Sequence, residues 1–316
     1  MRRAIAVLLT CLISVVLGGA VSSAPASAAT KFPVPYGFLL SAVAGGTQVD
    51  PPGANNFACQ PSKAHPRPVI LLHGILGNKA TNWQTYAPLL ANNGYCVFSL
   101  TYGQSPLLPA PANQLFGGLV AMEQSSLQVK AFVAKVLKAT KAKKVDIVGH
   151  SEGTVVPDYY VKYRGGAKYV DHYISLAPLW HGTDLGGLTA LTTMGAPFGV
   201  TPALYQVIGA VAASTTEFLA GSAFMTKLRA GGTPAVRGVH YTNIVTRYDE
   251  LVQPYTSGIQ AGMTNYVVQD FCAMDYSEHF EIAADPVAAQ LVLNTLDPKH
   301  KHAVPCRLVL PFVGGS

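Results

Sequence analysis

A near-apolar run that ends in a serine between two glycines constrains the fold of this chain more than any other feature. The run, Val145–Val148, leads directly into the sequence GHSEG at Gly149–Gly153, and a helical pattern continues to about Arg164. Glycine two residues before and after Ser151 allows the tight turn, known as a nucleophile elbow, that presents a serine at the end of a strand. A turn of small residues without chemical function would not explain a polar side chain at the centre of an apolar sheet. We therefore predict a strand–turn–helix unit with Ser151 at its tip.

Other short apolar runs alternate with helical patterns along the chain. The runs that predict strands are Val69–Leu72, Cys96–Leu100, Tyr169–Leu176 and the sequences HYTNIVT and TNYVVQD. Helical patterns occupy NWQTYAPLLANNG, which stops near Gly94, then Met122–Lys138, and a stretch from Asp285-Pro286 to about Leu296. This alternation predicts an α/β fold of the doubly wound kind, a mainly parallel sheet covered by helices on both faces. In such folds the active site lies beyond the carboxyl ends of the strands.

The first 28 residues have the layout of a secretory signal peptide. Arg2 and Arg3 precede an apolar run, Ala4–Val21, and the triplet Ala26-Ser27-Ala28 provides a small-residue cleavage site. The apolar run is at the lower limit for spanning a bilayer, so a cleaved signal is favoured over a membrane anchor. We predict a signal peptide at 1–28, a secreted protein, and a single domain at 29–316.

The composition argues against nucleic acid as a partner and is consistent with an apolar ligand. The formal net charge of +6 falls to about +4 (6 minus 2) without Arg2 and Arg3, and the other basic residues are scattered rather than clustered. Only 12% of the residues are charged, and 49% are hydrophobic. A secreted chain with so little charge either keeps apolar surface for a purpose such as an apolar substrate, or is simply rich in alanine and valine.

Four cysteines lie in the predicted mature chain: Cys59, Cys96, Cys272 and Cys306. An even number of cysteines in an exported protein predicts disulfides. Four cysteines allow three pairings, among which the spacing makes Cys59–Cys96 and Cys272–Cys306 the local choice. None belongs to a CxxC pair, so we predict no zinc site.

A serine hydroxyl becomes a nucleophile when a base removes its proton and a carboxylate orients that base. In the architecture that carries a nucleophile elbow, the acid and then the histidine follow the serine along the chain. His279 is the predicted base, because it lies in a loop between a strand and the helix that begins at Asp285-Pro286. His181, after the strand ending at Leu176, is the alternative. The other histidines after the serine lie at strand starts or in a basic tail: His172, His240, His300 and His302.

Asp249 is the predicted acid, because the sequence NIVTRYDELVQP places it just past the end of a strand. Glu250 beside it is the second candidate. The weaker candidates are Asp270 and Asp275, which precede His279 on the same loop, and Asp184.

The negative oxygen that forms when serine attacks an ester requires two backbone N–H donors. One belongs to the residue after the serine, and the other to the loop after an early strand. We predict Glu152 and Ile75, and we expect His73 and His150 to shape their loops by hydrogen bonding. If the Glu152 side chain pointed inward, its charge would repel the negative oxygen, whereas turned away it would suit the N-terminus of a helix.

The segment Leu185–Thr226 contains a single charged residue, Glu217, and includes LGGLTALTTMGAPFGVTPAL. It belongs to an insertion between strands at about 179–238, where α/β-hydrolases carry caps or lids. Its apolar character predicts an acyl-binding wall or a mobile lid, and a buried helical pair is the alternative.

Several segments together resemble the secreted class 2 lipases of actinobacteria. They are PVILLHGILGN with a following NW, VDIVGHSEGT, APLWHGT, TRYDELVQP and EHFEIAADPVAAQLVLNTLD, and DELVQP also resembles the yeast lipase B type. The resemblance runs from about Val34 to Cys306. It implies an α/β-hydrolase fold and hydrolysis of carboxylic esters, typically acylglycerols, without a metal or organic cofactor.

Carried over to this sequence, the resemblance implies a triad of Ser151, Asp249 and His279. It implies oxyanion donors at Ile75 and Glu152, and two disulfides that suggest the pairs Cys59–Cys96 and Cys272–Cys306. Many relatives carry glutamine after the serine, whereas this chain has Glu152, a difference that bears on rate and pH range more than on reaction type.

We therefore expect a secreted serine carboxylic ester hydrolase of the triacylglycerol lipase type, which acts through an acyl-enzyme on Ser151. Its partner would be a lipid or ester substrate, including one at a lipid–water interface, without a stable membrane anchor. A short-chain esterase, an acyltransferase and a polyester hydrolase are alternatives that use the same residues. A non-catalytic binding protein of this fold is a remote alternative, because such a protein usually lacks one member of the triad.

Overall fold

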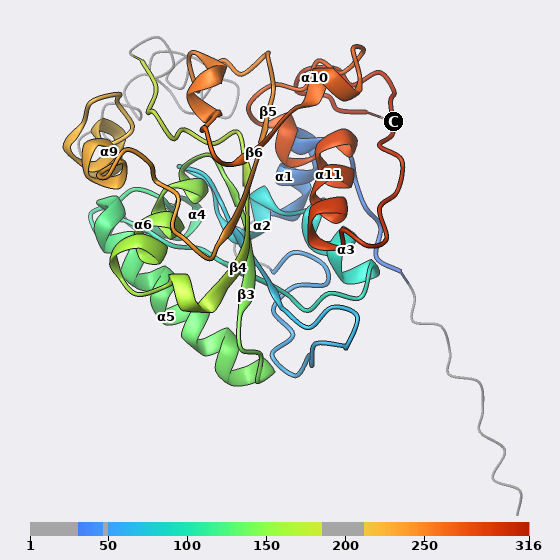
Figure 1. The fold of residues 1–316 in the computed structure, drawn as a ribbon, viewed down its shortest axis with the longest axis horizontal. Helices are drawn as coiled ribbons and strands as arrows, with labels where there is room; N and C mark the ends of the chain where they lie inside the picture. The colour runs from blue at the N-terminus through green and yellow to red at the C-terminus, as the bar shows by residue number, and fades with distance from the viewer. Residues whose placement is uncertain (1–30, 47–49, 185–211, 316) are drawn as a thin grey trace, which may run out of the picture. The chain divides into compact units, whose positions relative to one another are not determined.

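A sheet of six parallel strands runs through the described part of the chain (Figure 1). The structure, a computed structural model, describes residues 31–46, 50–184 and 212–315. The strands are β1 (Val69–Leu72), β2 (Val97–Leu100), β3 (Val145–His150), β4 (Val170–Leu176), β5 (His240–Val245) and β6 (Thr264–Val267). Their order in space is β2-β1-β3-β4-β5-β6, and every neighbouring pair is parallel. The predicted α/β fold is confirmed.

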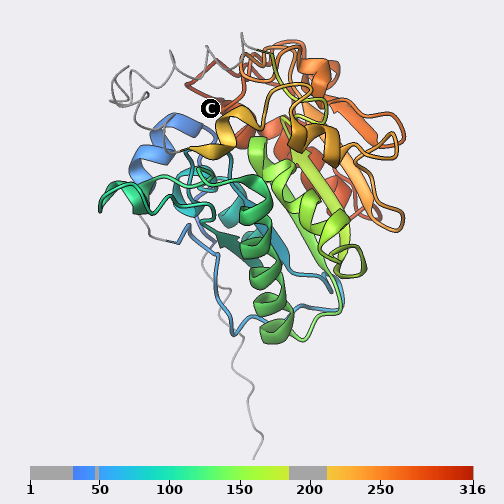
Figure 2. The ribbon, with the colours of Figure 1, turned by 90° about the vertical axis from the view of Figure 1, so that its left-hand side faces the viewer.

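Helices cover both faces of this sheet (Figure 1; Figure 2). The first face packs against α5 (Met122–Thr140), α6 (Val156–Tyr163) and α9 (Ala223–Leu228), and the second against α3 (Tyr86–Asn92) and α11 (Pro286–Leu296). The shorter helices are α1 (Phe38–Gly45), α2 (Lys79–Asn82), α4 (Ala112–Leu115) and α10 (Val268–Phe271). Short 3₁₀ turns are η1 (Ser151–Thr154), η2 (Ala167–Tyr169), η4 (Ala213–Thr216), η5 (Tyr255–Gly258) and η6 (Glu281–Ala283).

The two longest helices among the described residues form where their sequences predict. In α5 the buried side chains of Val129, Val133 and Val136 recur at the spacing of one helical face. At the start of α11, Asp285 accepts a hydrogen bond of 2.6 Å from the Ala288 N–H, and proline occupies the first turn, where its missing N–H costs nothing.

The side chains of β1 alternate between two hydrophobic cores. Ile70 and Leu72 pack on the α5–α6 side of the sheet, and Val69 and Leu71 on the α3–α11 side, all four of them fully buried. Because both faces are covered, this strand is apolar at every position, which explains why the sequence shows a continuous run instead of alternation.

The direction in which strands are added reverses at β1. Its neighbours are β2 on one side and β3 on the other, although the chain visits β2 first. The connections that leave the carboxyl ends of β1 and β3 therefore diverge, and ligands bind in the space between such connections. This topology places the loop that begins at His73 next to the turn at Ser151.

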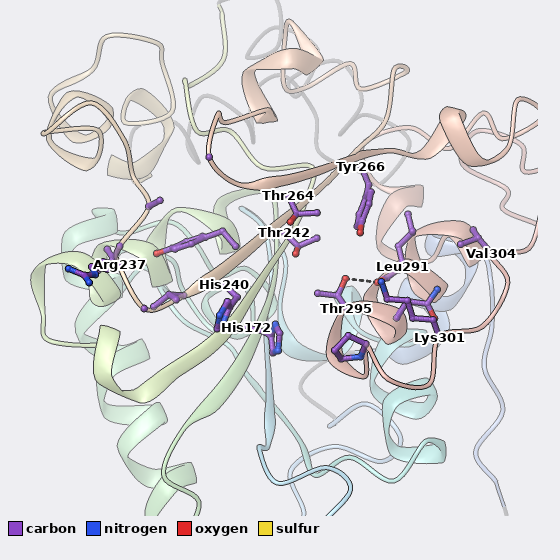
Figure 3. A pocket seen from close by; sticks show the side chains of 18 of the residues that line it. His172, Arg237, His240, Thr242, Thr264, Tyr266, Leu291, Thr295, Lys301 and Val304 are labelled. Carbon is purple, nitrogen blue, oxygen red and sulfur yellow. Dashed lines mark hydrogen bonds between the residues drawn. The ribbon is translucent and has the colours of Figure 1, made fainter.

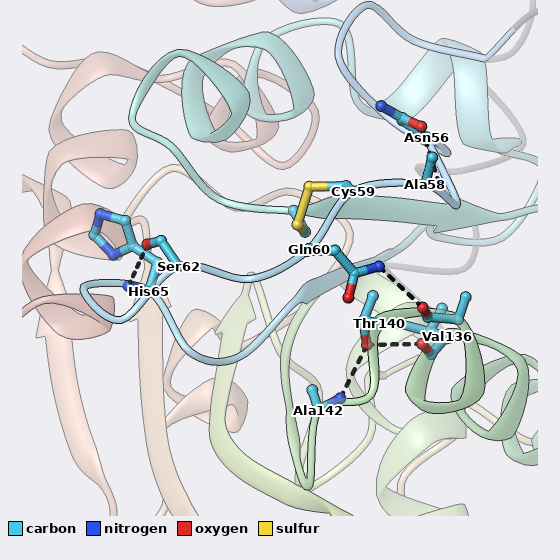
Figure 4. Close-up of a disulfide and its surroundings, with 11 residues drawn as sticks. Asn56, Ala58, Cys59, Gln60, Ser62, His65, Val136, Thr140 and Ala142 are labelled. Atoms are coloured by element: carbon cyan, nitrogen blue, oxygen red, sulfur yellow. Dashed lines mark hydrogen bonds between the residues drawn. A yellow bond between two sulfur atoms is a disulfide. The ribbon is translucent and has the colours of Figure 1, made fainter. Parts of the chain in front are cut away.

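Two disulfides join peripheral segments of the chain. Cys59–Cys96 links the segment before β1 to the start of β2 (Figure 4), and Cys272–Cys306 links the end of α10 to the C-terminal segment. These are the local pairings, with sequence separations of 37 and 34 residues. Disulfides that close loops stabilise a folded protein by typically ~2–4 kcal/mol, mainly through the unfolded state.

Several element boundaries differ from the sequence expectation; the helix expected over NWQTYAPLLANNG, for example, begins only at Tyr86 as α3. Two of the differences have a clear physical reason. The helix expected from about Gly153 is a 3₁₀ turn followed by α6, because Pro157 has no N–H for a continuous α-helical ladder. The strand expected over TNYVVQD ends at Val267. The side chain of Gln269 bonds instead to Thr246 Oγ1 and to the Arg247 N–H, within α10.

The predicted signal peptide at 1–28 lies outside the described residues, as does most of the apolar segment, 185–211. Of the predicted insertion at about 179–238, the described parts contain η4 and α9. Among the helices that the structure describes, none combines the length and the apolar character needed to cross a bilayer.

Candidate active site

Ser151 stands between β3 and η1 in a backbone conformation that residues other than glycine rarely adopt. Its φ is 54°, in the left-handed region. Strain of this kind costs about 1–3 kcal/mol and persists only where the surroundings enforce it. A Cβ on Gly149 would collide with the Gly153 carbonyl, and a Cβ on Gly153 would collide with the Leu72 carbonyl. Backbone packing therefore requires both glycines of the motif and holds Ser151 in its turn.

The side chains of Ser151, His279 and Asp249 form one hydrogen-bonded chain. His279 Nε2 lies 2.9 Å from Ser151 Oγ, and His279 Nδ1 lies 2.9 and 3.0 Å from the carboxylate oxygens of Asp249. A carboxylate only accepts, so Nδ1 donates to Asp249 and leaves Nε2 to accept the hydrogen bond from Ser151. The imidazole is therefore in the form that can remove the serine proton.

Asp249 lies after β5 and is fixed by backbone donors. Its Oδ1 accepts hydrogen bonds from the N–H groups of Leu251 at 3.0 Å and Val252 at 2.7 Å. Burial by itself lowers the pKa of His279, but the adjacent Asp249 carboxylate, with help from Glu250, outweighs burial and raises that pKa above its ordinary value. The carboxylate thus both orients the ring and favours its protonated form.

The backbone of His279 is held from two sides. Its N–H donates to Glu250 Oε2 at 3.2 Å, and its carbonyl accepts a hydrogen bond from His150 Nε2 at 2.8 Å. Glu250, the second candidate for the acid, therefore contacts the backbone and not the imidazole. The sequence does not predict this role, because its signal there is limited to the position of Glu250 next to Asp249.

Two further buried histidines, His150 and His73, are neutral. Burial lowers the pKa of His150 to about 3 and that of His73 to about 4. His73 Nε2 accepts a hydrogen bond from the Tyr102 N–H at 3.2 Å, so Nδ1 donates to the Gly74 carbonyl at 2.7 Å. His150 Nδ1 lies 3.1 Å from Asn82 Oδ1. Both rings fix loops in place, in line with the sequence expectation.

The loop after β1 passes close to Ser151. A Cβ on Gly74 would lie 2.9 Å from Ser151 Cβ, so only glycine allows this approach. Within the described residues, the N–H groups of Ile75 and Glu152 have no hydrogen-bond partner, whereas the next N–H in the loop, that of Leu76, is bonded. The two predicted oxyanion donors are therefore N–H groups that no described residue engages.

The Glu152 side chain points into the protein. It is fully buried, and neither carboxyl oxygen has a hydrogen-bond partner among the residues described. A Cβ on Gly118 would lie 2.6 Å from Glu152 Oε2 and 3.0 Å from Ile75 Cα, so the carboxyl packs beside the loop of Ile75. Burial, with a smaller contribution from Glu217, raises the pKa of Glu152 well above its ordinary value. The Glu152 side chain thus points inward, and burial favours the neutral, protonated form of its carboxyl.

An apolar cluster borders the same loop. Leu108, Leu119 and Ala212 are buried together, and Ile75 and Phe116 pack against them. Apolar walls with a few polar groups are typical of small-molecule sites. This side of the site is therefore suited to the apolar part of a ligand.

The other candidates from the sequence lie away from Ser151. Among the described residues, its side chain is hydrogen bonded to His279 and to none of the rivals His172, His181, His240, Asp270 and Asp275. In the same part of the chain, no three or more His, Cys, Asp or Glu side chains are arranged to hold a metal ion.

A cavity of about 650 Å³ opens at the opposite, amino end of the sheet (Figure 3). Its walls include His172 at the start of β4, His240 at the start of β5, Tyr266 from β6 and the exposed Lys301. None of the predicted catalytic or oxyanion residues lines it. This cavity and the hydrogen-bonded triad therefore lie at different ends of the strands.

Comparison with known proteins identifies a family model and a curated relative. The model for class 2 lipases matches residues 66–292. A stretch of 102 residues is 34% identical to the gastric triacylglycerol lipase of Bos taurus and covers 28% of this chain and 25% of that protein. The matched stretch thus spans a quarter of the length of that relative.

Solved structures share the fold at low sequence identity. Lipase B of Aspergillus fumigatus has a TM-score of 0.59 and 22% identity, over 81% of this chain and 56% of that one. The mature form of the lipase BlEst2 from Bacillus licheniformis has a TM-score of 0.54 and 16% identity, over 75% of this chain and 94% of that one.

Proposed function

We propose a function for this chain on the premise that it belongs to the class 2 lipase family. Its fold is that of the α/β-hydrolases. The proposed activity is hydrolysis of carboxylic esters, with acylglycerols as the substrate class. One observation carries the proposal: Ser151, held in a left-handed turn, is hydrogen bonded to His279, which is hydrogen bonded to Asp249.

In the proposed reaction, Ser151 Oγ attacks the ester carbonyl carbon while His279 Nε2 takes its proton. Asp249 keeps the imidazole oriented and stabilises its protonated form. The carbonyl oxygen becomes negative and accepts hydrogen bonds from the N–H groups of Ile75 and Glu152. His279 then gives its proton to the departing alcohol, which leaves an acyl group on Ser151. Water, activated by the same histidine, releases the acid and restores the serine.

The substrate class rests on the surroundings of the oxyanion loop. The partly exposed side chains of Ile75 and Phe116 pack against the buried cluster of Leu108, Leu119 and Ala212, and they lie where the acyl group of a bound ester would enter. Apolar surface beside the scissile carbonyl favours esters of fatty acids over esters of small polar acids. The identity to a triacylglycerol lipase over 102 residues supports the same class.

We also propose that the protein is secreted. Two disulfides are typical of proteins that fold in oxidising compartments, and the segment 1–28 has the pattern of an export signal. Expression with this segment in an exporting host, followed by N-terminal sequencing of the protein in the medium, tests the proposal. We expect a mature start near Ala29, and protein retained in the cell with an intact N-terminus would contradict it.

Hydrolysis of nitrophenyl esters of short and long fatty acids tests the proposed activity, with Ser151→Ala as the matched variant. We expect activity on long chains and a fall of roughly 10⁴-fold or more in the variant, whose unfolding curve should be unchanged. Activity on short chains alone would identify an esterase. Hydrolysis retained in Ser151→Ala would overturn the assignment of the nucleophile.

A further inference from the structure

We propose that the side chain of Glu152 is a proton switch for the hydrolysis proposed above. The site works while this carboxyl carries its proton, and it loses activity when the carboxyl ionises. The inference rests on the proposed function and adds to it, because the part played by Glu152 in the reaction is that of its backbone N–H, whereas the switch belongs to the side chain.

The part of the chain that the structure describes provides no hydrogen-bond donor or cation that would stabilise a negative charge on this carboxyl. The side chain is fully buried, and both of its oxygens lack a hydrogen-bond partner among the described residues. An ionised carboxylate without donors or a cation is one of the most costly groups to bury in a protein, and it takes up a proton instead. The direction of the pKa of Glu152, well above its ordinary value, agrees with this geometry.

The ionisable groups around Glu152 are acidic or neutral on each element packed against it. Glu217, at the end of η4, is a like charge; its Oε2 accepts a hydrogen bond of 2.7 Å from the Met122 N–H. Tyr102, after β2, donates its hydroxyl to the His73 carbonyl at 2.7 Å and has no proton left for Glu152. His73, after β1, stacks on Tyr102 and is neutral. Within the described residues no lysine or arginine compensates the carboxyl.

The carboxyl has no room to turn away. Gly118 lies against Oε2, so closely that a Cβ on this glycine would overlap the carboxyl. The Gly118 carbonyl accepts a hydrogen bond of 2.6 Å from Ser214 Oγ of η4, which closes the same side. Because these backbone segments are packed and hydrogen bonded, the Glu152 side chain cannot rotate into solvent. When the pH rises, the carboxyl therefore ionises in its buried position.

Ionisation of this carboxyl would affect the reaction directly. The carboxyl lies beside the loop of Ile75, and its own backbone N–H is the second proposed oxyanion donor. A negative charge here would repel the oxygen that becomes negative in the transition state, and the buried site would screen that repulsion poorly. The same charge would strain the packing around Gly118. Both effects lower the rate of hydrolysis, so activity is lost as the pH rises and Glu152 ionises.

The test is the dependence of kcat/KM on pH for the full mature protein with a soluble nitrophenyl ester, from about pH 5 to about pH 10. We expect the wild type to lose activity on the alkaline side by about tenfold per pH unit, and Glu152→Gln, which cannot ionise, to lack this alkaline limb. Asp158→Asn is the matched control. It removes a buried carboxyl whose pKa is raised by burial to about 7 but which faces Tyr241, and it should keep the alkaline limb.

A second variant keeps the proposal falsifiable if Glu152→Gln fails to fold. Glu217→Gln retains the acceptor for the Met122 N–H but removes the like charge, so Glu152 should ionise more easily and the alkaline limb should move to lower pH. Circular dichroism at each pH separates this limb from unfolding. An alkaline limb unchanged in both variants would overturn the switch, whereas hydrolysis retained in Ser151→Ala would overturn the proposed function itself.

Discussion

The two segments that meet at the active site are held in place by different forces. The elbow, Gly149–Gly153, is held by shape, because its two glycines leave no space between neighbouring backbones. The His279 loop, defined here as Cys272–Asp285, is held by buried carboxyl groups that accept backbone hydrogen bonds. Glu278 accepts from the Glu281 N–H at 3.0 and 3.1 Å, and Glu281 accepts from the Phe38 N–H at 2.9 Å.

These carboxyl groups make the His279 loop sensitive to protons in a way that the elbow backbone is not. Burial raises the pKa of Glu278 to about 8 and that of Glu281 to about 7. The nucleophile is thus positioned by steric fit, whereas the loop of the base is held by buried carboxyl groups whose ionisation costs folding free energy. Substitutions in each segment can therefore test whether the two are held in these different ways.

The variant Asp249→Asn changes the hydrogen bonding of His279 and leaves the elbow, Gly149–Gly153, unchanged. We expect kcat/KM to fall about 10⁴-fold, because an amide can donate to His279 Nδ1 and so leaves the proton on the nitrogen that faces Ser151. The unfolding free energy should change little, since the amide oxygen can still accept from Leu251 and Val252. Ester kinetics and a urea unfolding curve measure both quantities. A larger loss of rate in Glu250→Gln would show that the wrong carboxylate was assigned.

The variant Gly153→Ala disturbs the steric fit of the elbow. We expect it to lower the unfolding free energy by about 4 kcal/mol or more, because the new Cβ meets the Leu72 carbonyl and the backbone must move. Gly165→Ala is the matched control: Gly165 has φ 78° but nothing within 4 Å of a new Cβ, so the cost should be only about 1 kcal/mol. Equal losses in the two urea curves would show that packing does not hold the elbow.

The stability of the protein should fall as the pH rises. The folded chain holds the protons of Glu278 and Glu281 more tightly than the unfolded chain, so unfolding releases them and is favoured by alkali. Between the ordinary pKa of 4.5 and the folded value of about 7, Glu281 alone accounts for a loss on the order of 3 kcal/mol. Thermal unfolding at several pH values between these limits measures the slope. Glu281→Gln should flatten it, and an unchanged slope in that variant would contradict the assignment.

The smallest effect is expected for Glu250→Gln, which keeps an acceptor for the His279 N–H but removes a charge. The negative charge of Glu250 contributes to the raised pKa of His279, so its loss should lower that pKa. The acid limb of kcat/KM, which reports protonation of the base, should therefore move to lower pH. An acid limb that does not move would mean that Asp249 alone sets the charge of the imidazole.

Much of the fold was predictable because it depends on local patterns. The apolar run before Ser151 and the apolar spacing of α5 follow from strand and helix periods, and the glycines beside the serine admit few turns. The parallel sheet and its helices were predicted on this basis. The end of β6 was not, because the side chain of Gln269 forms bonds to a segment that the local pattern cannot reveal.

The members of the site were predictable, but their buried partners were not. Ser151, Asp249 and His279 follow strand ends in the order that the architecture requires. The contact of Glu250 with the His279 backbone, and the burial of Glu152 without a hydrogen-bond partner among the described residues, depend on how distant segments meet in space. A sequence shows which polar groups exist, while the cost of burying them is set by neighbours that only the fold brings together.

The disulfide Cys272–Cys306 makes a covalent ring from the segment that contains His279 and α11. The exposed stretch Pro298–Ala303 lies within that ring. A protease that cuts there would leave His279 and α11 on the larger piece, and the short C-terminal piece would stay attached through Cys306 until the disulfide is reduced. The same stretch is therefore a natural place for new chain ends in a circular permutant, or for an inserted tag, of this protein.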